Sequence, residues 1–258
     1  MSKAVKKNVA IQKVEQLSSD IFSMYLVDAS IANQAKAGQF ISLYSQDGSN
    51  LLPRPISICE IDQEEGTIRL VFRVVGKGTK EFSKLQAGDT IAAMGPLGNG
   101  FTLEGQKAIL IGGGIGIPPM LELAKQLHAK GVEVQAVLGY RDALFLNDEF
   151  EQYGKVYIST EDGSVGTKGN VIDAIKEHGL MADMIYACGP NPMLRGVKAY
   201  AMEQNIRAQI SLEEKMACGI GACLACVCKS KEKDAHSHVH NKRICKDGPV
   251  FYCEEVEL

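Results

Sequence analysis

The stretch Cys218-Gly219-Ile220-Gly221-Ala222-Cys223-Leu224-Ala225-Cys226-Val227-Cys228, with Cys245 downstream, decides the fold of the C-terminal part of the chain. It contains four of the eight cysteines. The spacing C-x4-C-x2-C with a distant fourth cysteine is the plant-type pattern of a 2Fe–2S cluster, whose binding loop wraps three thiolates around the irons. Gly219 and Gly221 suit such a loop, because they can adopt positive φ and leave N–H groups pointing at sulfurs. The stretch therefore predicts an iron–sulfur loop.

Two other uses of the cysteines compete with the cluster. A structural zinc site also takes four cysteines, although its ligands usually come as two separated short-spaced pairs, and this alternative stays open. A disulfide framework is disfavoured, because the chain opens with Met1-Ser2-Lys3-Ala4 and carries no apolar signal segment. We therefore expect reduced thiols and a cytoplasmic protein.

Length and charge limit the possible partners. The 258 residues suffice for two compact domains and a small appendage. A net charge of −3 predicts no basic surface for nucleic acid, and no apolar run approaches the roughly 18 residues of a membrane span. We expect neither nucleic acid nor membrane binding.

The N-terminal part alternates short apolar runs with Gly, Asp, Asn and Pro, which predicts an antiparallel β barrel or sandwich over residues 5–103. Within it, Arg54-Pro55-Ile56-Ser57 places an arginine that can clamp a diphosphate, although an arginine on a barrel rim is often only solvated. The later Gly76-Lys77-Gly78-Thr79-Lys80 is expected to form a glycine-rich turn. Its backbone N–H groups and the Thr79 hydroxyl can donate hydrogen bonds to the same phosphates.

The pattern changes after residue 106. Lys107-Ala108-Ile109-Leu110-Ile111 indicates a buried strand, Gly112 to Pro119 a glycine loop, and Met120 to Leu127 an amphipathic helix. This order predicts a nucleotide-phosphate site with proline in the first helical turn. Pro119 stands where the third glycine of the dinucleotide fingerprint belongs, so a simple strand-to-helix connection remains an alternative.

Three further strand patterns follow, at 133–140, 155–160 and 184–188, and they predict a parallel sheet flanked by helices. Cys188 falls at a strand end, where open sheets bind ligands, or else is a small core residue. His236, His238 and His240 lie in a polar stretch that we interpret as a solvated loop rather than a metal site.

These motifs occur in the order found in the ferredoxin–NADP reductase superfamily, and they cover residues 1 to about 210. The cysteine loop with Cys245-Lys246-Asp247-Gly248-Pro249 resembles the electron-transfer subunit of class 1B dihydroorotate dehydrogenase. The resemblance implies a β barrel plus α/β fold with three domains. These are an FAD-binding antiparallel barrel (1–103), an NAD-binding parallel-sheet domain (104–210) and a small 2Fe–2S domain (211–258).

The resemblance also implies the site residues. For FAD they are Arg54, Pro55, Ile56, Ser57, Val71, Phe72, Arg73, Gly78 and Thr79. For the nicotinamide nucleotide they are Gly112, Gly113, Gly114, Gly116, Cys188, Gly189 and Pro190. For iron they are Cys218, Cys223, Cys226 and Cys245, which makes Cys228 a spare thiol. The chain departs from many superfamily members at Ile56, where they carry a tyrosine that packs on the flavin.

The implied function is electron transfer in pyrimidine (UMP) biosynthesis, from a dihydroorotate-oxidising FMN subunit through the cluster and FAD to NAD⁺. A flavin suits this position, because it handles both the hydride of nicotinamide and the single electrons of a cluster. The chain has no room for a (β/α)8 barrel of about 250 residues, so a partner is required, as a heterotetramer of two copies of each subunit.

Some alternatives remain open. The chain could serve a hydrogenase-type or ferredoxin-linked NAD(P) reductase complex, or be a zinc-stabilised binding module. NAD is favoured over NADP, because Tyr140-Arg141-Asp142 and Glu161-Asp162 would surround the ribose with mixed charge.

Overall fold

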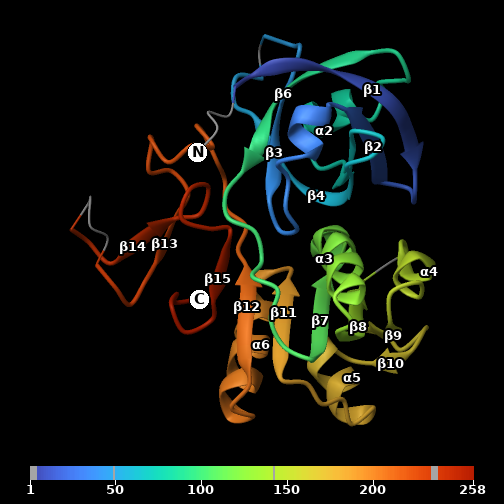
Figure 1. The fold of residues 1–258 in the computed structure, drawn as a ribbon, viewed down its shortest axis with the longest axis vertical. Coiled ribbons are helices and arrows are strands. Elements are labelled where there is room, and N and C mark those ends of the chain that lie inside the picture. The colour runs from blue at the N-terminus through green and yellow to red at the C-terminus, as the bar shows by residue number, and fades with distance from the viewer. Residues whose placement is uncertain (1–4, 49, 142, 234–237) are drawn as a thin grey trace.

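The computed structural model describes residues 5–48, 50–141, 143–233 and 238–258. It contains a barrel, a helix-flanked sheet and a C-terminal segment that lies beside both (Figure 1).

The N-terminal part is a closed antiparallel barrel with strand order β1-β2-β5-β4-β3-β6, so the predicted barrel is confirmed. Alternate side chains of its strands, such as Ile41 and Leu43, fill the interior. The short helices α1 and α2 lie in the connections from β2 to β3 and from β5 to β6. The bounds are β1 Lys7–Gln16, β2 Ile21–Val27, α1 Ala29–Ala32, β3 Phe40–Tyr44, β4 Arg54–Asp62, β5 Thr67–Arg73, α2 Lys77–Phe82 and β6 Thr90–Leu97.

The middle part is a sheet of order β10-β9-β8-β7-β11-β12-β15, parallel from β10 to β12, as the sequence predicts. Strand order reverses between β7 and β11, and open α/β sheets bind ligands in a crevice outside the carboxyl ends of the strands at such a point. The bounds are β7 Lys107–Gly113, η1 Gly114–Gly116, α3 Pro118–Ala129, β8 Glu133–Tyr140, α4 Asn147–Phe150, β9 Lys155–Thr160, β10 Thr167–Lys168, α5 Val171–Glu177, β11 Met184–Cys188, α6 Asn191–Glu203 and β12 Arg207–Ser211.

The C-terminal segment forms a hairpin of β13 (Val227–Lys229) and β14 (Asn241–Arg243), followed by β15 (Val250–Tyr252). β15 pairs antiparallel with β12 and so extends the sheet of the preceding domain. The N–H of Asn99, just after the barrel strand β6, donates to the Gly248 carbonyl at 2.7 Å. The segment is thus fixed to both other parts of the molecule.

A polar contact fixes the barrel against the sheet domain. Arg69 of β5 is only 5% exposed and forms ion pairs with Glu60 of the barrel and Glu149 of α4. On α3, the buried Glu122 accepts a hydrogen bond from the Ile61 N–H at 2.8 Å. These bonds set how the strand ends of the sheet face the barrel.

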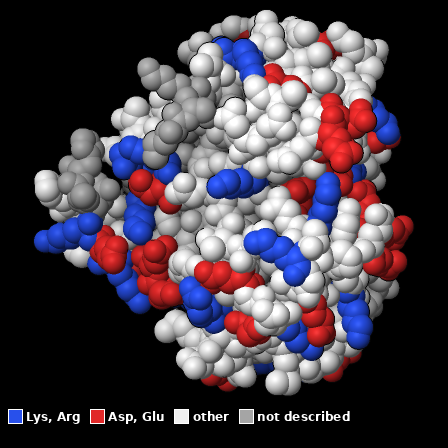
Figure 2. All heavy atoms as spheres, in the orientation of Figure 1, with Lys and Arg blue, Asp and Glu red and all other residues white. Residues whose placement is uncertain are grey.

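The surface in Figure 2 carries Lys and Arg interspersed with Asp and Glu. Mixed charge of this kind does not favour a nucleic-acid interface on the face drawn. Within the described ranges, no helix has the length and apolar character needed to cross a membrane.

Candidate functional site

The cysteine loop directs its backbone N–H groups at sulfur atoms. The N–H groups of Ile220 and Ala222 lie 3.5 and 3.3 Å from Cys218 Sγ, and the N–H of Gly221 lies 3.0 Å from Cys245 Sγ. Gly219 and Gly221 have φ of 71° and 83°, in the left-handed region that favours glycine. N–H donors of this kind favour thiolates, the form that binds iron.

The four predicted ligands lie in two thiol pairs. The side chain of Cys218 interacts with that of Cys223, and the N–H of Cys245 donates to Cys226 Sγ at 3.4 Å. Among the described residues, no three His, Cys, Asp or Glu side chains gather around the position of one metal ion. Each pair can supply two thiolates to one iron of a two-iron cluster.

Cys218 and Cys245, one from each pair, have pKa values shifted in opposite directions. Burial opposes the thiolate of Cys218, but hydrogen bonds from Ile220, Cys223 and Ala222 outweigh it and lower the pKa to about 6. Burial and the neighbouring Cys226 raise the pKa of Cys245 to about 12. Cys218 therefore loses its proton at a lower pH than Cys245, and iron must displace the proton of Cys245 when it binds.

Cys228 lies apart from these pairs. It pairs with Lys242 across the hairpin of β13 and β14, and its thiol donates to the Lys242 carbonyl at 3.6 Å. Burial raises its pKa to about 11. The Cys228 thiol is thus bonded within the hairpin, and its assignment as a spare cysteine stays a prediction.

In the barrel, the structure brings Arg54 and Gly78 together. A Cβ on Gly78 would lie 2.9 Å from Arg54 Nε, so the guanidinium occupies the space above this glycine. The same guanidinium donates to the Leu52 carbonyl, which holds it at the start of β4. An arginine fixed in this way can bind a diphosphate with little loss of side-chain entropy.

The predicted turn at 76–80 instead forms the first turn of α2, which begins at Lys77. The N–H groups of Val75 and Gly76 donate to Thr79 Oγ1 at 3.0 and 3.2 Å, and this cap favours the helix. Thr79 is buried, and its hydroxyl is already bonded to its own helix. The Thr79 hydroxyl, which the sequence predicts to contact phosphate, is thus bonded to the backbone at the start of α2 instead.

The other predicted flavin residues lie on β4 and β5. Pro55, Ile56 and Ser57 are half-buried along β4. The Phe72 ring is in the barrel interior, 6.2 Å from the Phe22 ring, so only its backbone faces outward. Arg73 lies beside the Asp20 carboxylate, 3.2 Å away. Val71, also on β5, packs against apolar residues of the sheet domain.

At the crevice of the sheet, the glycine loop meets the end of β11. Gly112 and Cys188 are opposite one another on β7 and β11. A Cβ on Gly116 would lie 2.4 Å from the Cys188 carbonyl oxygen, and one on Gly113 would lie 2.5 Å from Met193 Sδ. These glycines permit close contact of the two loops.

Gly114 differs from its neighbours. It has φ of +52°, and a Cβ there would meet nothing within 4 Å. Its backbone therefore faces open space at the strand ends, where a pyrophosphate would approach in an open α/β sheet.

The surroundings of this loop are partly apolar. Burial raises the pKa of Cys188 to about 12, so this thiol is neutral. Gly189 packs against Met193, and Pro190 lines a cavity of about 720 Å³ that extends between α5 and α6 to Glu161.

The residues predicted to surround the ribose are only partly described. Tyr140 is buried, with its hydroxyl donating to the Phe145 carbonyl, and so does not face a ribose. Asp142 lies outside the described residues.

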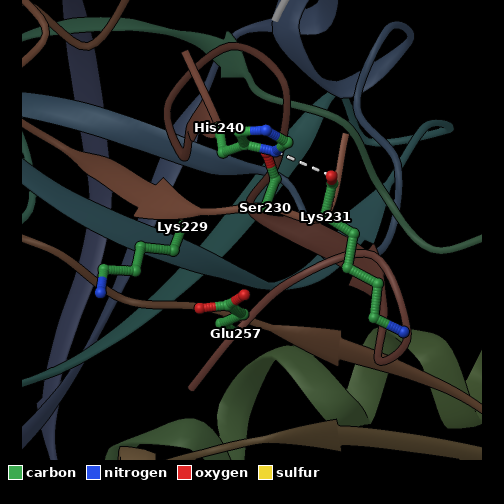
Figure 3. A pocket seen from close by; sticks show the side chains of 5 residues that line it. All are labelled: Lys229, Ser230, Lys231, His240 and Glu257. Atoms are coloured by element: carbon green, nitrogen blue, oxygen red, sulfur yellow. Dashed lines mark hydrogen bonds between the residues drawn. The ribbon is translucent and has the colours of Figure 1, made fainter. Parts of the chain in front are cut away.

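The histidine-rich loop is only partly described. His236 lies outside the described residues, while His238 and His240 are exposed. Figure 3 shows His240 with its ring Nδ1 2.8 Å from the Lys231 carbonyl, beside a hollow lined by Lys229, Ser230, Lys231, His240 and Glu257. This environment agrees with a solvated loop.

Sequence reasoning missed the residues that place the three sites relative to one another. Arg69, Glu122 and Asn99 bond to partners between 61 and 148 positions away. Local patterns carry no signal for such contacts.

Sequence profiles of three domains match the chain. They are the oxidoreductase FAD-binding domain over residues 8–101, the oxidoreductase NAD-binding domain over 110–199, and the iron-sulfur cluster binding domain of dihydroorotate dehydrogenase B over 213–257. The chain therefore has FAD, NAD and iron–sulfur domains, and its cofactors are FAD, NAD and the cluster, as the sequence predicts.

Curated relatives and solved structures agree. The electron transfer subunits of dihydroorotate dehydrogenase B (NAD(+)) from Fusobacterium nucleatum and Streptococcus mutans are 42% and 44% identical to the chain. The two alignments cover 98% of this chain and 98% and 99% of the relatives. A chain from the structure of an NADH-dependent reduced ferredoxin-NADP oxidoreductase is 32% identical, with a TM-score of 0.86, over 100% of this chain and 91% of that one.

A ferredoxin NADP+ reductase from Neisseria gonorrhoeae shares the fold at 19% identity and a TM-score of 0.66, over 78% of this chain and 92% of that one. Since the curated relatives match over almost their whole length, the chain belongs to the family of dihydroorotate dehydrogenase B (NAD(+)) electron transfer subunits.

Proposed function

We propose that this chain transfers electrons from a dihydroorotate-oxidising FMN subunit to NAD⁺ in pyrimidine biosynthesis. When bound, FAD exchanges two electrons with nicotinamide and single electrons with the iron–sulfur cluster. The proposal follows the names of its curated relatives, and it assigns the catalytic oxidation of dihydroorotate to the partner.

The observation that carries the proposal is the position of the cysteine loop against the barrel. Gly219 packs on Ser42 of β3, and Ser42 pairs with Pro55 of β4, the strand that begins at Arg54. The cluster loop is thus one strand away from the predicted flavin motif. A short path between the two sites is what single-electron transfer within one chain requires.

The residue roles follow from this arrangement. Cys218, Cys223, Cys226 and Cys245 would hold the cluster, because their sulfurs lie in two pairs beneath donating N–H groups. Arg54 would bind the flavin diphosphate. Open backbone at Gly114 would receive the nicotinamide nucleotide, with the neutral thiol of Cys188 lining the crevice.

We also propose that domain boundaries lie near residues 103 and 210. The first falls between β6 and β7, and the second at the end of β12. The cytoplasm is the proposed location, since none of the eight cysteines is in a disulfide and thiols stay reduced there. The proposed assembly is a heterotetramer with two FMN-containing catalytic subunits.

The test is co-expression with a candidate FMN subunit from the same genome, followed by copurification and iron, FAD and FMN analysis. Dihydroorotate-dependent NAD⁺ reduction is expected from the complex but from neither subunit alone. The matched control is the same complex with Cys245→Ser. Absence of this activity, together with ferredoxin-dependent NAD(P)H oxidation, would instead favour the ferredoxin-linked complex, which the 32% identical chain supports as the second candidate.

A further inference from the structure

The barrel has one buried hydroxyl, that of Ser42, on the side that contacts the cysteine loop. Ser42 of β3 is completely buried, and its Oγ has no hydrogen-bond partner among the described residues. A buried hydroxyl without a partner is unfavourable, and native structures seldom keep one unless a ligand or water completes it.

The surroundings of Ser42 show which ligand is within reach. Along β3, Ile41 and Leu43 point into the barrel, so Ser42 points outward together with Phe40 and Tyr44. Phe40 and Tyr44 pack in the same apolar cluster as Cys226 and Cys245. The hydroxyl therefore lies in the contact between the barrel and the cysteine segment.

The cysteine loop lies against this hydroxyl. A Cβ on Gly219 would lie 3.1 Å from Ser42 Oγ, so the residue after Cys218 lies directly over the serine.

We propose that the Ser42 hydroxyl donates a hydrogen bond to a sulfur of the bound cluster and thereby raises its reduction potential. The inference rests on the proposed four-cysteine site. Reduction adds negative charge to the cluster, and a donor at sulfur stabilises that charge. Because Ser42 pairs with Pro55, it also stands on the side of the cluster that faces the predicted flavin strand.

Ser42→Ala tests the inference in the purified subunit with its cluster bound. The variant removes one oxygen from an apolar contact, so folding and iron content are expected to be unchanged. We expect about a tenfold fall in the equilibrium constant for one-electron reduction of the cluster, which corresponds to 59 mV. The potential is measured by dithionite titration followed by electron paramagnetic resonance.

A second readout identifies the hydrogen bond directly. Fe–S stretching frequencies, measured by resonance Raman spectroscopy in H2O and D2O, should shift less on exchange in Ser42→Ala than in the wild type. Ser159→Ala is the matched control, because Ser159 of β9 is also buried with an unpartnered Oγ but belongs to the sheet domain. It should leave both readouts at wild-type values.

The outcomes separate this inference from the proposed function. A full cluster with unchanged potential in Ser42→Ala would overturn the inference and leave the four-cysteine site standing. A shift in the flavin potential alone would also overturn it, by assigning the hydroxyl to FAD. Wild-type protein that binds no iron after reconstitution would overturn both.

Discussion

Gly114→Ala tests whether the loop after β7 binds the nicotinamide nucleotide. Gly114 has φ of +52° and open space where a Cβ would stand, so alanine meets no protein atom and only the left-handed backbone is strained. That strain costs roughly 1–2 kcal/mol. For a chain of this size, each 1 kcal/mol lowers the melting temperature by about 2–4 °C.

The effect on NADH should be larger than the effect on stability. The new methyl group would occupy the approach of the pyrophosphate, and losing one hydrogen bond to a charged group costs about 1.5–3 kcal/mol. Affinity for NADH should therefore fall about 10- to 100-fold, measured as the NADH dependence of FAD reduction in a stopped-flow instrument. The bound flavin spectrum should not change.

Gly131→Ala is the matched control for Gly114→Ala. Gly131 has φ of +77° and also meets nothing within 4 Å, but it follows α3 at the far end from the crevice. Both variants should lose similar stability, and only Gly114→Ala should lose NADH affinity. Equal NADH affinity in the two variants would refute the assignment of this loop and leave it as a connection.

Three further predictions address the other sites. Arg54→Ala should lose FAD on gel filtration, with affinity reduced at least about tenfold, because it removes a charge-assisted hydrogen bond; undiminished flavin would exclude Arg54 from the site. Cys228→Ser should keep its full iron and visible absorbance, whereas Cys245→Ser should lose both; the reverse result would show the fourth ligand to be wrong. Burial raises the pKa of Glu122 in the folded protein above its value in the unfolded chain. At a pH above the folded pKa, the charged carboxylate therefore lowers the free energy of unfolding, whereas at a pH below the unfolded pKa the group is protonated in both states and has no such effect. Glu122→Gln should therefore raise the melting temperature at about pH 7 but not at about pH 4, and an equal effect at both would contradict the reasoning.

Local patterns predicted the barrel and the parallel sheet, because short apolar runs separated by Gly, Asp, Asn and Pro, and the strand, glycine loop and helix at 107–127, are determined by neighbouring residues. The same is true of the cysteine loop, where ligand spacing and glycines coincide. β15 could not be predicted. It has three residues, and its partner strand β12 ends long before it in sequence.

The residues at the contacts between domains could not be predicted from the sequence either. Ser42 and Arg69 alternate with apolar neighbours on their strands, which is typical of a polar position facing solvent. They are buried only because segments from elsewhere in the chain cover them, the cysteine loop at Ser42 and α4 at Arg69. Their roles depend on domain packing, for which neither residue type nor spacing gives a signal.

The pairing of β15 with β12 covers the edge of the parallel sheet. A parallel sheet that ended at β12 would present a row of unpaired N–H and C=O groups, and such an edge recruits strands from other chains. Here the covering strand begins five positions after Cys245, and that cysteine is held by the N–H of Gly221 in the cluster loop. Cells short of iron would therefore accumulate subunits with a loosened edge strand, and we expect these to appear first as aggregates rather than as soluble protein without a cluster.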